Sequence, residues 1–91
     1  MSGAWPPKVK VTYTRHALAV LEERGLEAAW VEATLLRPDC TAPDPAGAGT
    51  RRYDRSIPER DGRVMRVVAV ESGDERRILT VFLDRRARRP Q

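Results

Sequence analysis

Hydrophobic and polar residues alternate near the start of the chain and again in its second half, with a helical period between. Residues 8–13 read KVKVTY, in which lysines alternate with apolar or β-branched side chains. This pattern is typical of a short strand with one exposed face. Lysines are common on edge strands, where they discourage pairing with other chains. We therefore expect an edge strand over Lys8–Tyr13.

Two helices are predicted next, separated by a glycine. Thr14 suits the N-cap of a helix over Arg15–Arg24, and Gly25 suits its C-terminal stop. A second helical segment, about Glu27–Leu36, ends before Arg37-Pro38 because the residue before a proline is disfavoured in a helix. The expected buried stripes are Ala17, Leu18, Val20 and Leu21 on the first helix and Ala28, Val31 and Leu35 on the second.

The second half of the chain changes to a period of two. Residues 39–49 have no periodicity and contain several Pro and Gly, so we expect a loop there. Three strands joined by short turns follow, over 50–57, 63–71 and 77–83, and the last two are apolar on both faces, as in central strands. The sequence thus predicts a single α+β domain over 1–91, ordered β-α-α-β-β-β, with a helical hairpin packed on a small antiparallel sheet. Residues 1–7 are expected as an N-terminal arm and 85–91 as a frayed basic tail.

The positive charge of the chain is concentrated in its second half. Residues 1–49 hold 5 Lys and Arg against 6 Asp and Glu (net −1), whereas residues 50–91 hold 12 against 7 (net +5). Of the 17 basic residues, 15 are Arg, whose planar fork suits phosphate recognition. The pattern favours RNA or another polyanion as a partner, and a merely solvated surface is the alternative.

Several functional classes receive no support from the sequence. Cys40 and His16 are the only residues of their kinds, which leaves no Cys/His cluster for zinc, and we expect no metal or cofactor. Cys40 is interpreted as an ordinary thiol. No apolar run approaches the roughly 20 residues of a membrane span, and the N-terminus has no apolar stretch of signal-peptide length. A cytoplasmic protein is the expectation.

His16 is the first candidate for chemistry. It lies in the first turn of the first predicted helix, where free backbone N–H groups and the helix dipole favour a bound anion. A histidine beside a phosphate is common equipment for moving protons in RNA cleavage without metal. The alternative is a surface histidine that only makes a local hydrogen bond.

The strands supply arginine and tyrosine candidates. Within residues 50–57, Arg51, Tyr53 and Arg55 share one face, and Arg52 and Asp54 share the other. Arg66 interrupts an apolar strand, so it either lines an open surface that continues from these residues or pairs with an acidic neighbour such as Asp54. Arg24 has a sufficient structural role in closing the first helix.

Residues 9–84 resemble a bacterial family called domain of unknown function 4258. The resemblance rests on the runs Tyr13-Thr14-Arg15-His16-Ala17, Glu23-Arg24-Gly25-Leu26, Leu35-Leu36-Arg37-Pro38-Asp39, Arg51-Arg52-Tyr53 and Leu79-Thr80-Val81-Phe82. It implies kinship with the RelE and BrnT type toxins, whose α+β fold several metal-independent ribonucleases share, and an active surface lined by His16, Arg24 and the segment 51–53. The family pattern usually carries an Arg one helical turn after the His, where this chain has Val20.

The leading hypothesis from these observations is a toxin-like endoribonuclease that acts on RNA or the ribosome without metal. His16, Arg52 and Tyr53 are its expected catalytic residues, and the expected nucleic-acid contacts are Arg15, Arg24, Arg51, Arg55 and Arg66. The first alternative is a non-catalytic module that binds nucleic acid or an antitoxin protein. The second is a structural domain that forms a homodimer through the edge strand Lys8–Tyr13.

Overall fold

Two helices and five strands make up the structure, a computed structural model that describes residues 10–45 and 47–88, the last four by backbone alone. The elements in chain order are β1 (Lys10–Tyr13), α1 (Arg15–Arg24), α2 (Ala28–Leu36), β2 (Cys40–Pro43), β3 (Thr50–Ile57), the 3-10 helix η1 (Pro58–Arg60), β4 (Arg63–Ser72) and β5 (Glu75–Arg88). The expected α+β class is confirmed. The expected N-terminal arm lies outside the described residues, whereas β5 continues through Arg88 into the segment expected as a tail.

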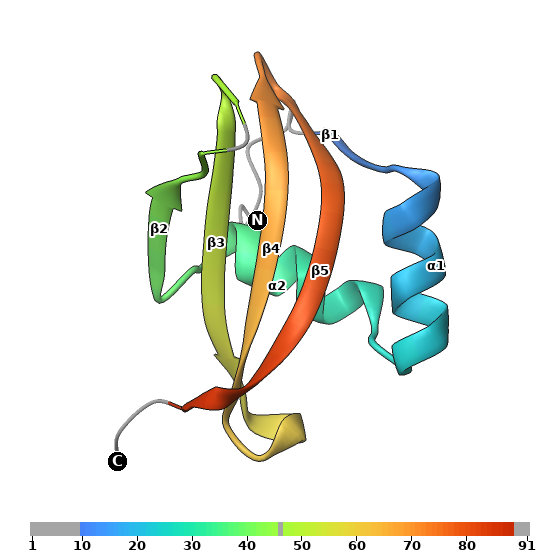
Figure 1. The fold of residues 1–91 in the computed structure, drawn as a ribbon, viewed down its shortest axis with the longest axis vertical. Coiled ribbons are helices and arrows are strands. Elements are labelled where there is room, and N and C mark those ends of the chain that lie inside the picture. Colours follow the sequence, from blue (N-terminus) through green and yellow to red (C-terminus); the bar gives the residue numbers. More distant parts are fainter. Residues whose placement is uncertain (1–9, 46, 89–91) are drawn as a thin grey trace, which may run out of the picture.

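The sheet is mixed, which corrects the antiparallel sheet expected from the sequence. Its strand order is β1-β5-β4-β3-β2, and the pairs among β2, β3, β4 and β5 are antiparallel. β1 pairs in parallel with β5, with Tyr13 opposite Ile78. Local patterning cannot reveal this direction, because β1 and β5 lie at opposite ends of the sequence. The edge position of β1 and the central positions of β4 and β5 agree with the predictions (Figure 1).

The segment expected as a loop contains strand β2, so that prediction was wrong. Its residues, CTAP, have little intrinsic strand preference. They are held by pairing with β3, in the register that sets Cys40 opposite Asp54 and Pro43 opposite Arg51. Proline is compatible with this place because β2 is an edge strand of the sheet. Tertiary pairing has overridden local preference here.

Helix α1 begins and ends where the sequence predicts. The hydroxyl of Thr14 accepts a hydrogen bond from the Ala17 amide at 3.1 Å and donates to the Ile78 carbonyl at 3.0 Å, which joins the N-cap to β5. Gly25 has φ 64°, and its amide bonds back to the carbonyls of the last turn. Ala17 and Leu21 are buried, but Leu18 is 53% exposed, which corrects its place in the expected stripe.

Helix α2 contacts β3 and β4, whereas α1 contacts β5 and β1. Figure 1 shows α2 crossing behind the sheet and α1 beside β5. The buried residues of α2 are Val31, Thr34 and Leu35, and Ala28, expected on the buried stripe, is exposed. Thr34 is compatible with burial because its hydroxyl donates to the Trp30 carbonyl at 2.8 Å.

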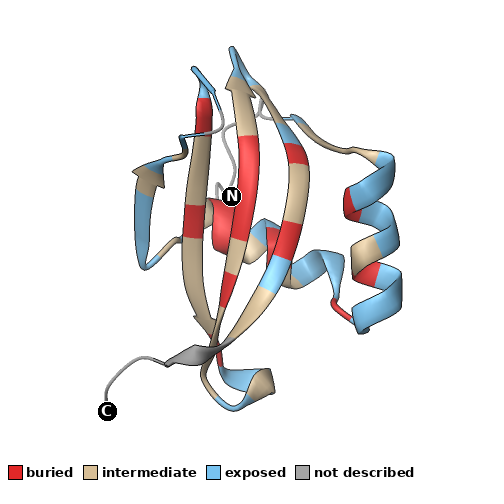
Figure 2. Ribbon diagram, viewed as in Figure 1, coloured by how far each residue is buried: buried red, intermediate tan, exposed pale blue. Residues whose placement is uncertain are grey.

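The strand register sorts side chains onto two faces of the sheet. Tyr53, Val67 and Val81 are opposite one another across β3, β4 and β5, and all three belong to the buried core with residues of both helices (Figure 2). We call this side the covered face. Arg52, Val68 and Thr80 form the equivalent row on the other side, the open face, which neither helix crosses in Figure 1.

Candidate functional site

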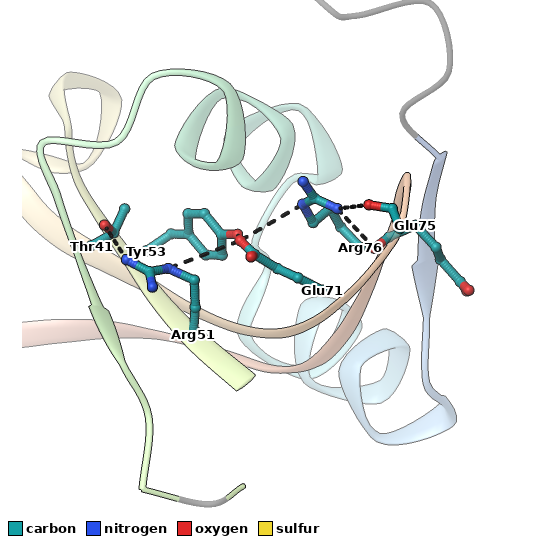
Figure 3. Close-up of polar contacts among 7 residues, drawn as sticks. Thr41, Arg51, Tyr53, Glu71, Glu75 and Arg76 are labelled. Carbon is teal, nitrogen blue, oxygen red and sulfur yellow. Dashed lines mark hydrogen bonds and ion pairs between the residues drawn. The ribbon is translucent and has the colours of Figure 1, made fainter. Parts of the chain in front are cut away.

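Four polar residues of β3, β4 and β5 meet on the covered face, near the turn that joins β4 to β5. The Tyr53 hydroxyl donates a hydrogen bond to Oε2 of Glu71. The same oxygen lies 4.0 Å from Nε of Arg51 and 3.8 Å from Nε of Arg76. Figure 3 shows Glu71 between the two arginines. We call Arg51, Tyr53, Glu71 and Arg76 the tyrosine cluster.

Neighbouring groups hold the two arginines of the tyrosine cluster in place. Arg51 donates to the Thr41 hydroxyl on β2 at 3.0 Å, so the strand missed from the sequence helps to build the site. Arg76 donates to the carbonyls of Gly73 and Glu75, both at 3.0 Å. The arginine side chains are 37% and 25% exposed and that of Glu71 is 33% exposed. The two arginines and Glu71 are therefore fixed in geometry yet reachable from solvent, whereas Tyr53 is 6% exposed.

All three contacts to Glu71 converge on its Oε2 atom. Among the described residues, no hydrogen bond or ion pair to Oε1 is seen, so this second carboxylate oxygen keeps its capacity to accept a hydrogen bond. A carboxylate in this position can accept a proton, and two guanidinium groups beside it can balance negative charge on a phosphate. The arrangement joins a base, a phenol and two cations.

Burial raises the pKa of Tyr53 to about 12, with a further increase from its hydrogen bond to Glu71. Burial and the charge of Glu32 also raise the pKa of Tyr13. Because the neutral phenols are favoured in the folded state, their stabilisation is complete below the unfolded pKa near 10 and is lost as the pH rises through the folded values.

We expect the ultraviolet absorbance of tyrosinate to appear at a higher pH in the folded protein than in the urea-unfolded chain. In Tyr13→Phe, whose only tyrosine is Tyr53, the midpoint should lie near pH 12, because burial and Glu71 oppose ionisation. Spectrophotometric titration measures it, with the unfolded variant as the control. A folded midpoint near pH 10 would contradict the buried Tyr53–Glu71 contact.

The open face carries a different set of candidates. Arg66 donates to both carboxylate oxygens of Asp54, at 2.9 and 3.2 Å, and this contact raises the pKa of the guanidinium. Of the two alternatives for Arg66, the acidic pair is the one observed, and the residue does not continue the face of Arg51 and Tyr53. Its guanidinium also lies 5.6 Å from the ring centroid of Phe82, a cation–π contact.

His16 lies apart from the tyrosine cluster. Its Nε2 is 3.2 Å from the hydroxyl of Thr80, which belongs to the open-face row, whereas Tyr53 points into the covered face. His16 and Arg15 are both exposed on the first turn of α1, and Val20, one turn further on, is half-buried against the core. His16 is thus a surface histidine with a hydrogen bond to a neighbouring side chain, as the alternative interpretation expected. Its catalytic role stays a prediction.

The remaining arginine candidates are also distributed. Arg52 lies on the open face, opposite Arg51 and Tyr53, as the alternation of β3 predicted. Arg55 donates to the carbonyl of Arg37 at 2.7 Å and so stabilises the end of α2. Arg24 lines a separate cavity at the end of α1. The expected residues are therefore spread over several places. Of these residues, only Arg51 and Tyr53 belong to the tyrosine cluster.

The sequence of residues 13–83 matches the family described as domain of unknown function (DUF4258). This match covers most of the chain. The chain belongs to the DUF4258 family. No match was found among curated proteins or among solved structures.

The DUF4258 match includes every member of the tyrosine cluster as well as His16. Glu71 and Arg76 were not selected from the sequence, because each stands at the end of a strand beside a turn and is typical of a solvated surface there. The strand register of the β4–β5 hairpin could have revealed them. A hairpin turn at Gly73 sets Glu71 opposite Arg76 on the same face of the sheet. Locating the turn alone therefore brings the two together.

The described part of this DUF4258 protein has no cluster of metal ligands and no membrane-spanning helix. Within residues 10–45 and 47–88, no group of three or more His, Cys, Asp or Glu side chains lies close enough to hold a metal ion. No helix in the described part of the chain has the length and apolar character needed to cross a membrane.

Proposed function

We propose that this protein acts on RNA and that the tyrosine cluster cleaves the phosphodiester backbone without metal. The observation that supports the proposal is the convergence of Tyr53, Arg51 and Arg76 on one oxygen of Glu71. These groups match the needs of transesterification by a 2′-hydroxyl, which requires a base, a proton donor and cations for the phosphate. The net charge of +5 over residues 50–91, 12 basic against 7 acidic, favours a polyanionic substrate.

In the proposed step, Oε1 of Glu71 takes the proton of the 2′-hydroxyl as the 2′ oxygen forms a bond to phosphorus. Arg51 and Arg76 balance the charge that develops on the phosphate oxygens. The bond from phosphorus to the 5′ oxygen breaks, and Tyr53 gives that oxygen its proton. The Glu71 carboxyl then turns so that its new O–H group faces the Tyr53 oxygen, and the proton passes to Tyr53, which restores both groups. The products are a 2′,3′-cyclic phosphate and a 5′-hydroxyl.

The test is cleavage of a labelled single-stranded RNA in the presence of EDTA, with DNA of the same sequence as the control. We expect RNA fragments that end in cyclic phosphate and intact DNA, because DNA lacks the 2′-hydroxyl. Arg51 and Arg52 are neighbours on opposite faces of β3, so substituting each in turn shows which face carries the site. Arg51→Gln should lower the cleavage rate by about tenfold or more, the effect of one lost charge-assisted contact. If Arg52→Gln and His16→Ala abolish cleavage while Arg51→Gln does not, the site lies on the open face instead.

A second candidate function, binding of single-stranded nucleic acid without cleavage, is favoured by the open face. Phe82 is 37% exposed there and lies beside Arg66, so a base could stack on the ring next to a cation. RNA would then stay intact, and its affinity would fall steeply as salt rises. Phe82→Ala should weaken this binding, and an unchanged affinity in that variant would remove the open face from the interaction.

We further propose, from the resemblance of residues 9–84, that the protein is related to the RelE and BrnT type toxins. The support is the pair of helices packed on a sheet rich in arginine. Proteins of one fold can have different activities, so the relation to toxins needs a test of its own, separate from the test of RNA cleavage. Growth arrest on expression, relieved by a small protein encoded beside the gene, is the expected result.

A further inference from the structure

A cavity of about 360 Å³ opens at the other end of the sheet, between the end of α1 and the start of β4. It is lined by Glu23, Arg24, Leu26, Arg60, Arg63 and Leu83. Arg63 and Glu71 are eight residues apart on β4, which corresponds to roughly 26 Å at the rise of a strand. The cavity is therefore distinct from the tyrosine cluster.

Positive charge dominates the lining of this cavity. Three guanidinium groups face one carboxylate, a balance of +3 against −1. The salt bridges seen in the described part of the chain use Arg51, Arg66 and Arg76, and none of them involves the arginines of the cavity. Three like charges beside a single carboxylate repel each other, and a bound anion would relieve that repulsion.

Arg63 and Arg60 differ in how their side chains are held. The Nε–H group of Arg63 is buried and has no hydrogen-bond acceptor among the described residues. Nε of Arg52, which lies outside the cavity, has the same property, so the charge of the lining rather than this buried N–H group points to an anion. The guanidinium of Arg60 lies 5.7 Å from the ring centroid of Trp30, which holds that arginine at the cavity.

We propose that this cavity binds the phosphate of a nucleotide through Arg24, Arg60 and Arg63. The volume exceeds the needs of a phosphate ion and suits a ligand that carries a larger group. Leu26 and Leu83 give the cavity an apolar part on which a sugar or base can rest. The nucleotide comes either from solution or from an RNA strand, since both present the same phosphate. This site is independent of the proposed cleavage and can be tested alone.

Trp30 reports on the site because it contacts Arg60. The chain has two tryptophans, so Trp5→Phe isolates the fluorescence of Trp30. In this background we would titrate inorganic phosphate, AMP and a short oligouridine at low salt, with calorimetry in parallel. We expect saturable binding, weakened by about tenfold in Arg63→Gln, the effect of one lost charge-assisted contact. Binding of phosphate and AMP indicates a free ligand, and binding of oligouridine alone indicates RNA, so either result supports the site.

A variant with the opposite effect separates binding from loss of structure. Glu23→Gln removes the one carboxylate of the cavity and should tighten binding several-fold, because less negative charge opposes the anion. Arg77→Gln, which removes an exposed arginine of β5 outside the cavity, is the matched control. If none of the three probes binds, or if Arg63→Gln binds them as tightly as its parent, the proposal is wrong.

Discussion

Glu71→Gln is expected to lower RNA cleavage by about 100-fold or more, the usual contribution of a general base. Glutamine is nearly the same size and keeps an oxygen that can accept the Tyr53 hydroxyl, so the contact in the folded protein can persist. It cannot take the proton of a 2′-hydroxyl. The substitution therefore separates chemistry from packing, and the rate of cleavage under saturating RNA in EDTA is the measurement.

The same substitution should not weaken RNA binding. Glu71 lies within 4.0 Å of both Arg51 and Arg76, so its removal frees two cations to contact phosphate. We thus expect kcat to fall while KM stays constant or decreases, the signature of a group that acts in the transition state. Glu59→Gln makes the same chemical change at an exposed position on η1 and serves as the control. Cleavage by Glu71→Gln at the parent rate would exclude this carboxylate as the base.

The parts of the fold that depend on local sequence were predictable. Thr14 and Gly25 set the limits of α1 because capping and a positive φ are properties of single residues. The alternation of β3 placed Arg51 and Tyr53 on one face and Arg52 on the other because the strand period is fixed. Half of the tyrosine cluster follows from that alternation alone.

What could not be predicted depends on partners distant in sequence. Strand β2 exists through its pairing with β3, and the parallel pairing of β1 with β5 joins the two ends of the described chain. Arg66 was compatible with either interpretation until register set it opposite Asp54. A shift of one residue would have moved Arg66 to the face of Tyr53, because neighbouring residues of a strand point to opposite sides. The candidate site is thus determined by register, which single residues do not encode.

Ile78→Ala is expected to cost about 2–5 kcal/mol of unfolding free energy, the usual effect of deleting a large buried aliphatic side chain. Ile78 is fully buried, and it lies beside Tyr13 of β1 and Ala69 of β4. Its carbonyl also accepts the backbone and side-chain hydrogen bonds of Thr14. One residue of β5 therefore holds together the parallel edge strand, the sheet centre and the start of α1.

Urea unfolding of the variant should show a lower midpoint with an unchanged slope, since the same surface is exposed when either chain unfolds. The loss is a large part of the roughly 5–15 kcal/mol that stabilises an ordinary domain. Leu18→Ala is the matched control, because Leu18 is 53% exposed and alanine favours a helix, and its effect should stay within about 0.5 kcal/mol. A cost below about 1 kcal/mol for Ile78→Ala would contradict the junction of β1, β5 and α1 on which the parallel pairing depends.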